Sequence, residues 1–133
     1  MKAYISVSFS KRAALNDAVK TITEALRSSA ITPFIFVDVY HFHPVQEKEM
    51  MTAALKEIDN CDLLIAETSD KAIGIGIEAG YAKAKNKPVI YLRSKDAQHS
   101  TTLSGISDHT IVYADIPDLK NQLKKVLERY VQA

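Results

Sequence analysis

The sequence predicts an α/β fold of three layers, in which helices cover both faces of a doubly wound, five-stranded parallel sheet in the flavodoxin-like order 2-1-3-4-5. Three observations predict it. Short apolar segments alternate along the chain with longer segments of helical periodicity, which is typical of βα units. No Asn-Gly or Asp-Gly pair marks a tight hairpin between two apolar segments. The 133 residues, 47% hydrophobic and 25% charged, fit one globular domain that spans residues 1–133.

The first half of the chain supplies two strands and two helices. Alternating apolar residues at 3–9 (AYISVSF) predict the first strand, and the apolar stripe from Leu15 to Leu26 predicts the helix that follows it. The nearly continuous apolar segment FIFVDV at 34–39 predicts a second strand that is buried on both faces. Apolar residues recur at helical spacing between Met50 and Ile58, which predicts a helix near 46–60.

The second half repeats the pattern with three strands. The apolar segments that predict them occupy 61–67, 89–93 and 110–114. A helix with glycines near its start follows the first of these strands, and a last helix covers 117–130. The polar tract 94–108 is predicted to be a loop.

Composition narrows the class of partner and the compartment. The 17 Lys and Arg residues against 16 Asp and Glu leave a formal charge of +1, which disfavours binding to nucleic acid or to a membrane surface. No apolar run approaches the ~20 residues that cross a bilayer. The single cysteine, Cys61, excludes an intrachain disulfide, and the N-terminal residues lack a signal-like apolar core, so we expect a cytoplasmic protein with a small-molecule partner.

The most informative segment surrounds one carboxylate, Glu78. Gly74, Gly76 and Gly80 flank it at the start of the predicted helix, although a glycine inside a helix is less favourable than alanine by up to about 1 kcal/mol. Glycines are tolerated where the backbone must approach a ligand or another element closely, so Gly74 and Gly76 are candidate substrate-binding residues. The spacing places Glu78 in the first helical turn, where the helix dipole would keep it ionised.

Two other interpretations of this segment compete with a catalytic one. Glu78 is an ordinary first-turn acid if the glycines serve only to pack the helix on the sheet. A dinucleotide site is rejected, because the segment is one residue longer than G-x-G-x-x-G and follows the third strand instead of the first.

The segment CDLLIAETSDKAIGIGIEAGYAKAKNKPVIYL, from residue 61 to 92, closely resembles the core of the nucleoside 2-deoxyribosyltransferase superfamily. The resemblance is closest to its branch of 2′-deoxynucleoside 5′-monophosphate N-glycosidases. In that family an apolar strand ends in Ala-Glu and leads through a short turn to G-x-G-x-E-x-G-x-A. The matching residues here are Gly74, Gly76, Glu78, Gly80 and Ala82.

The resemblance implies roles for individual residues. Glu78 falls on the family nucleophile, and Tyr4 falls on the tyrosine that positions it. Leu103 and Ser104 are similar to a Leu-Ser pair that reaches a phosphate in the neighbouring subunit's site, which implies a homodimer or higher homo-oligomer. The resemblance implies no cofactor and no metal.

The chain departs from the family pattern on the predicted helix at 46–60. The family's catalytic aspartate aligns with Ala54, which cannot donate a proton. Glu57 lies one helical turn further along and can project from the same face, so it is the candidate substitute for that acid. Ala72 stands where the two branches have serine or aspartate, which leaves the choice between nucleosides and monophosphates open.

A second departure lies after the first strand, at Ser8, Ser10, Lys11 and Arg12. Two basic residues at a helix start are unfavourable toward the helix dipole, whereas an anion there is favoured by unpaired N–H groups. These four residues are therefore a candidate phosphate cradle, with a solvated basic turn as the alternative. Asp38, at the end of the predicted second strand, is a candidate to hydrogen-bond a base.

Three functions follow from these observations. The first is an N-glycosidase or 2-deoxyribosyltransferase that acts on a nucleoside or its 5′-monophosphate through Glu78, because a carboxylate under the ring stabilises an oxocarbenium-like transition state or forms a glycosyl ester. The second is a non-catalytic nucleotide-binding module, suggested by Ala54 and Ala72. The third is an NAD-cleaving domain of the TIR type, which shares the sheet and a helical glutamate.

Overall fold

The computed structural model describes residues 1–131 and confirms the predicted fold class. A single sheet of five parallel strands has the order β2-β1-β3-β4-β5. The strands are β1 (Lys2–Ser6), β2 (Thr32–Ile35), β3 (Leu63–Glu67), β4 (Val89–Ser94) and β5 (His109–Tyr113).

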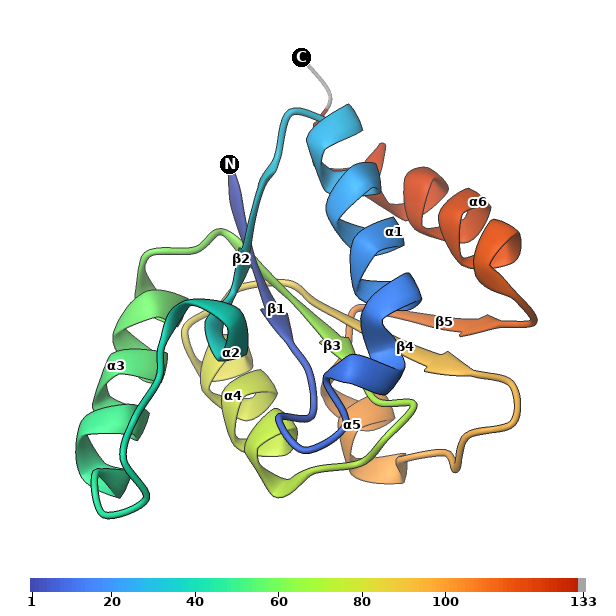
Figure 1. Ribbon diagram of the computed structural model, residues 1–133. Helices are drawn as coiled ribbons and strands as arrows, with labels where there is room; N and C mark the ends of the chain where they lie inside the picture. The colour runs from blue at the N-terminus through green and yellow to red at the C-terminus, as the bar shows by residue number, and fades with distance from the viewer. Residues whose placement is uncertain (132–133) are drawn as a thin grey trace.

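Helices cover both faces of this sheet (Figure 1). One face carries α1 (Asn16–Ser28), which a short 3-10 turn η1 (Ala13–Leu15) precedes, and α6 (Ile116–Leu127). The other face carries α3 (Glu47–Asp59), α4 (Ile73–Ala84) and α5 (Thr101–Ile106). A four-residue helix, α2 (Phe36–Val39), follows β2 directly.

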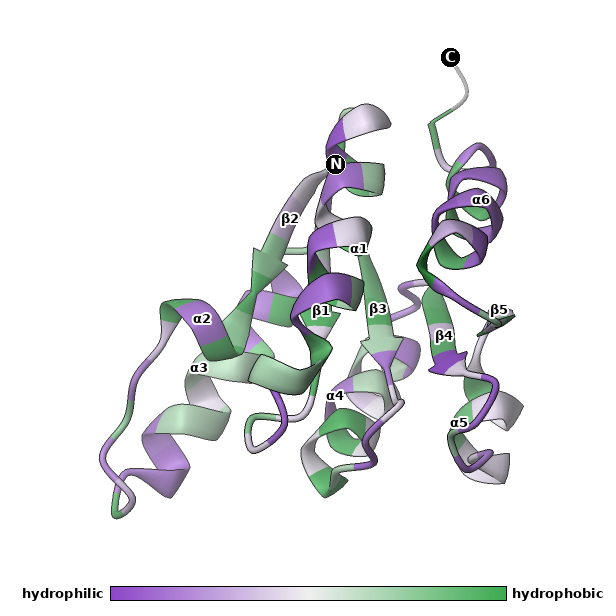
Figure 2. Ribbon diagram, turned by 45° about the vertical axis from the view of Figure 1, so that its right-hand side comes forward, coloured by the Kyte–Doolittle hydropathy of each residue, from purple (hydrophilic) through white to green (hydrophobic). Residues whose placement is uncertain are grey.

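Each face of the sheet has its own hydrophobic core, because successive side chains of a strand point to opposite faces. In β1, Ile5 packs under α1 and α6, whereas Tyr4 belongs to the core under α3, α4 and α5. In Figure 2 the central strands are predominantly hydrophobic and the outer side of α6 is hydrophilic. Both cores are thus formed by the alternation within the strands.

Two predicted elements are wrong in part. The predicted strand 34–39 ends at Ile35, and its last four residues form α2. Its side chains are not buried on both faces, because β2 is an edge strand paired only with β1. The predicted loop 94–108 contains α5, whose Ser100 accepts a capping hydrogen bond from the Leu103 amide and whose Leu103 is buried.

The topology also fixes where a site can form. β1 lies between β2 and β3, and Ser6 pairs with Ala66. The chain leaves β1 toward α1 on one face and leaves β3 toward α4 on the other. Loops diverge at such a switch point and open a crevice at the carboxyl ends of the strands, so residues 7–12 and 68–72 border the candidate site.

Candidate functional site

Glu78 projects from α4 onto β1 and is held there by two hydroxyl groups. The Ser6 hydroxyl donates a hydrogen bond to Glu78 Oε1 over 2.6 Å, and the Tyr4 hydroxyl donates to Oε2. Tyr4 and Ser6 are both buried and point to one face of the strand, since they are two residues apart. Each carboxylate oxygen therefore has one donor and keeps a further lone pair for another partner.

The structure corrects the expected position of Glu78 in its helix. α4 begins at Ile73 and has no acidic residue in its first turn, so Glu78 lies in the second turn, where the dipole acts weakly. Burial raises the pKa of Glu78, and the hydrogen bonds from Ser6 and Tyr4 act in the opposite direction. The two hydroxyl donors, more than the helix terminus, favour the ionised form.

Ser6 was not predicted as a site residue. Its signal was present in the alternation of the predicted strand 3–9, because Tyr4, Ser6 and Ser8 alternate there with apolar residues. A buried hydroxyl needs a hydrogen-bond partner, so a serine inside a buried strand indicates a polar group opposite it. Ser8 is also buried, and its Oγ lies 3.3 Å from Ser10 Oγ.

The glycines of α4 border open space. No protein atom outside the helix backbone lies within 4 Å of a Cβ built on Gly74 or Gly76. Packing of the helix on the sheet therefore does not require glycine at these positions. The start of α4 also lacks a side-chain cap, because its N-cap residue is Ala72.

A cavity of about 490 Å³ lies between α4 and α5. It is within the range of sites for small ligands, and its walls include Lys71, Ala72, Gly76, Ser100 and Leu103. Ser104 is the next residue of α5 and is half-buried. Glu78 does not line this cavity, so the carboxylate faces β1 and the cavity borders the first turns of the same helix.

The basic residues after β1 have separate environments. Arg12 forms a bidentate ion pair with Asp38, in which Nε and Nη2 each lie 2.8 Å from a carboxylate oxygen. Lys11 is exposed. The structure thus joins two predicted binding residues, Arg12 and Asp38, to each other.

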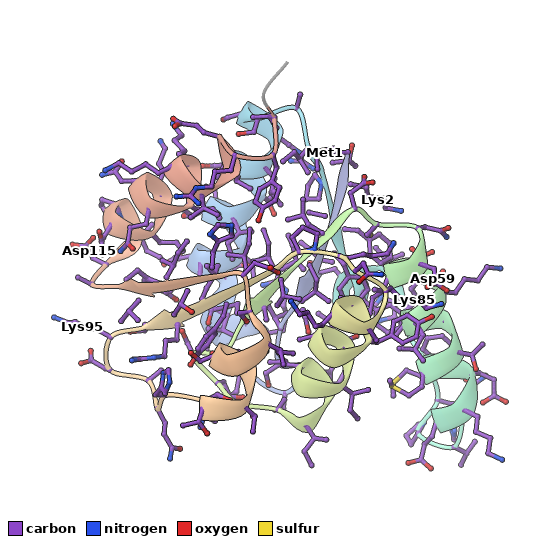
Figure 3. All side chains as sticks on the ribbon, turned by 180° about the vertical axis from the view of Figure 1, so that it is seen from behind. Met1, Lys2, Asp59, Lys85, Lys95 and Asp115 are labelled. Atoms are coloured by element: carbon purple, nitrogen blue, oxygen red, sulfur yellow. The ribbon has the colours of Figure 1, made fainter. Side chains whose placement is uncertain are left out.

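Glu57 and Ala54 lie on the α3 side of the same face. Ala54 is buried in the core that contains Tyr4. The Glu57 carboxylate lies 3.9 Å from Lys2 Nζ, at the first residue of β1, whereas Tyr4 and Ser6 hold Glu78 further along that strand. The ends of α3 and α4 meet nearby, where Asp59 and Lys85 form an ion pair of 3.9 Å (Figure 3). The described partner of Glu57 is Lys2, and no described contact joins Glu57 to Glu78.

A second buried carboxylate, Glu67, was not predicted as a functional residue. It ends β3 and is fully buried. The Ser69 amide donates to its Oε1 over 2.5 Å, and the Tyr113 hydroxyl donates to its Oε2 over 2.7 Å. Burial raises the pKa of Glu67, and these hydrogen bonds oppose the shift.

Within residues 1–131 no three His, Cys, Asp or Glu side chains are grouped to hold a metal ion. Across the same residues, every helix is too short or too polar to cross a bilayer.

Comparison with protein families identifies the chain. The family model for nucleoside 2-deoxyribosyltransferase matches residues 4–125. The chain belongs to the nucleoside 2-deoxyribosyltransferase family. The matched region includes both residues that hold Glu78, Glu78 itself and the walls of the cavity.

Individual relatives of this family member are distant. Two proteins carry the name "Putative 2'-deoxynucleoside 5'-phosphate N-hydrolase 1". The one from Methanosarcina barkeri is 32% identical over 87 residues, which cover 65% of this chain and 54% of the relative. The one from Thermofilum pendens is 26% identical over 137 aligned positions, which cover 96% of this chain and 95% of the relative.

A solved family structure shows the same fold. The 2-deoxyribosyltransferase of Bacillus psychrosaccharolyticus superposes with a TM-score of 0.72 at 18% identity, and the match covers 96% of each chain. At this identity the likeness concerns the arrangement of strands and helices.

Proposed function

We propose that this protein cleaves the N-glycosidic bond of a 2′-deoxynucleoside or its 5′-monophosphate, with Glu78 as the nucleophile. The observation that carries the proposal is the Glu78 carboxylate, which accepts one hydroxyl hydrogen bond on each oxygen from a helix whose glycines border open space. Family membership and the names of the two relatives support the substrate class.

The first step places the substrate sugar over Glu78. A carboxylate oxygen bonds to C1′ while the C1′–N bond breaks, and the base leaves with the electron pair. Tyr4 and Ser6 fix the carboxylate for this attack, since each directs a hydroxyl hydrogen at one oxygen. Positioned polar groups of this kind lower the reorganisation needed as charge develops on the sugar.

The second step returns the free enzyme. Water attacks C1′, the C1′–O bond to Glu78 breaks, and 2-deoxyribose or its 5-phosphate leaves with one proton released. A second base in place of water gives transfer instead of hydrolysis. Both relatives are named as hydrolases, which supports water as the acceptor here.

The departing base needs a proton. Ala54 cannot supply it and is buried. Glu57, one turn along α3, is the proposed donor, and in the structure its carboxylate lies 3.9 Å from Lys2 Nζ.

The test is the release of free base by wild type and by Glu78→Gln. Both are incubated with a panel of 2′-deoxynucleosides, their 5′-monophosphates and NAD, and the products are separated by chromatography. We expect the amide to abolish base release and to keep nucleotide affinity within about tenfold, because it preserves the shape and loses the charge. The matched control is Glu24→Gln, which changes an exposed glutamate of α1.

Each of the other outcomes would assign a different function to the protein. Unchanged turnover in Glu78→Gln would remove Glu78 as the nucleophile. Binding without release of base from any substrate would make wild type a nucleotide-binding module. Cleavage of NAD alone would favour the TIR-type activity.

A further inference from the structure

The carboxylate of Glu67 is buried beside the site, and the proposed reaction does not use it. Its side chain is 0% exposed, and none of the ion pairs within residues 1–131 includes it. Removing a carboxylate from water is strongly unfavourable unless it is hydrogen-bonded. A group kept at this position needs a structural or functional reason.

A directed chain of hydrogen bonds ends on Glu67. The Ser94 amide donates to Ser69 Oγ over 2.9 Å, and that oxygen lies 3.0 Å from the Tyr113 hydroxyl. The single hydroxyl proton of Tyr113 goes to Glu67 Oε2, so Ser69 must donate its own proton to the Tyr113 oxygen. The Ser69 amide closes the ring on Oε1. Ser69, in the turn after β3, is thus hydrogen-bonded to residues of three strands: Glu67 of β3, Ser94 of β4 and Tyr113 of β5.

That turn forms part of the cavity wall. Thr68 is tied to β4 by two hydrogen bonds to the Leu92 carbonyl, of 2.9 Å and 3.1 Å. Ser69 is tied to Glu67, and Thr68, Lys71 and Ala72 then line the cavity before α4 begins at Ile73. Among the described residues no acceptor is found for the amides of Asp70 and Lys71. The Ser69 amide is therefore the last amide of the turn with a described acceptor before the helix, and the only other described tether there is the side chain of Lys71, whose Nζ donates to the His99 carbonyl over 2.9 Å.

We propose that Glu67 is a positioning residue for substrate binding, which fixes the turn 68–72 through the Ser69 amide and so sets the wall of the cavity between α4 and α5. The proposal rests on the proposed function, in that the cavity receives the part of the nucleotide remote from the broken bond. Glu78 is held separately by Tyr4 and Ser6 on β1. Loss of Glu67 should therefore weaken binding more than it slows the chemical step.

The first experiment uses wild type alone. Amide hydrogen exchange of the full chain is followed by NMR, and the Ser69 amide is compared with those of Asp70 and Lys71. We expect Ser69 to exchange at least about tenfold more slowly, because an amide bonded to a buried acceptor exchanges only on local opening. Equal rates for the three amides would overturn the proposal without reference to activity.

The second experiment compares Glu67→Leu with Glu67→Gln. The leucine has no acceptor, so we expect KM for the preferred substrate to rise at least about tenfold while kcat per folded molecule stays within about threefold. The glutamine carbonyl can accept from Ser69 while its amide donates to Tyr113, so the conservative variant should restore KM to within about threefold of wild type. A destabilised core variant, Leu123→Ala in α6, controls for loss of stability, because its leucine is fully buried far from the turn in sequence.

The outcomes separate this proposal from the proposed function. A KM in Glu67→Leu equal to that of wild type and Leu123→Ala would show a purely structural role and overturn the positioning role. If wild type releases no base, calorimetric Kd values for 2′-deoxyadenosine 5′-monophosphate replace KM. We then expect Kd to rise in Glu67→Leu and to stay near the wild-type value in Glu67→Gln. If Glu67→Leu does not fold, the wild-type exchange rates and the KM of Glu67→Gln decide.

Discussion

At the scale of single residues, the ion pair between Arg12 and Asp38 bears on the choice between nucleosides and monophosphates. An arginine fork suits a phosphate as well as a carboxylate, and here Asp38 occupies it through Nε and Nη2. The pair is partly exposed, with side-chain exposures of 22% and 38%. A phosphate at this loop would compete with Asp38 for the guanidinium.

Asp38→Asn should therefore favour phosphorylated substrates. The substitution removes the competing charge and frees the Arg12 fork, so we expect KM for a 5′-monophosphate to fall several-fold and KM for the nucleoside to stay unchanged. The double variant Lys11→Ala with Arg12→Ala should act in the opposite direction, with a loss of about tenfold or more for the monophosphate alone. Steady-state kinetics on both substrates measure this, with Glu128→Gln, an exposed residue directly after α6, as a control for net charge. Equal changes for nucleoside and monophosphate would remove the phosphate cradle.

The resemblance to the family implied that Tyr4 positions Glu78, and the structure places the two side chains in contact. Neither Ser6 nor Glu67 was predicted as a site residue. The alternation of the first strand placed Ser6 on the same face as Tyr4, but the sequence did not show which polar group either residue would contact. Both are defined by partners distant in sequence, such as Tyr113, which is 46 residues from Glu67. Nor did the sequence show that Arg12 and Asp38 would pair, since Arg12 follows β1 and Asp38 follows β2, in two separate connections between a strand and a helix.

At the scale of elements, α3 decides whether the chain has a proton donor. Its inner face presents Ala54 to the core that contains Tyr4, and Glu57 lies one turn toward Lys2. A buried carboxyl group introduced at 54 would be close to the tyrosine that holds Glu78, at the cost of desolvation.

Ala54→Asp should raise turnover if only the donor is missing. We expect faster release of poor leaving bases. We also expect a lower melting temperature, since burial of a polar group destabilises the fold by about 1 to 3 kcal/mol. Thr52→Asp, on the exposed side of α3, is the matched control and should change neither the rate of base release nor the melting temperature. Glu57→Gln tests the proposed donor: if Glu57 protonates the base, the substitution should remove the alkaline limb of the pH–rate profile, where wild type slows as the donor loses its proton. An unchanged profile would exclude that role.

Long periodic elements were predicted from the sequence, and short ones were not. α1, α3 and α6 have clear apolar stripes, and the structure confirms them within a few residues. The four residues of α2 and the six of α5 are too short to show a helical period. FIFVDV has the composition of a strand, yet only its first two residues lie in β2, which ends at Ile35.

At the scale of the whole molecule, two buried carboxyl groups link stability to pH. The pKa values of Glu67 and Glu78 are raised by burial from the ordinary value of 4.5. A carboxyl group with a raised pKa binds its proton more tightly in the folded state. Its contribution to stability is complete below the unfolded pKa and is lost as pH rises through the folded pKa.

Glu78→Gln should therefore be more stable than wild type at neutral pH. The difference in the free energy of unfolding is expected to grow as pH rises above the ordinary carboxyl value of 4.5, because wild type must then ionise Glu78, whereas Glu67 titrates in both proteins. Urea denaturation at a series of pH values measures the difference, with Glu24→Gln as the exposed control. A difference that does not change with pH would contradict the raised pKa of Glu78.

The hydrogen bonds that hold Glu78 join residues that are 74 and 72 positions apart. A ribosome makes β1 first, and its inward hydroxyl groups have no carboxylate to bind until β3 and α4 have also been made. β1 is an inner strand of the sheet, yet its neighbour β3 arrives about sixty residues later along the chain. A nascent chain that stops before α4 has all of β1 and lacks Glu78, the proposed nucleophile. Under the proposed function, we expect products of interrupted synthesis to be inert toward nucleosides, since the proposed site exists only in chains that have passed this point.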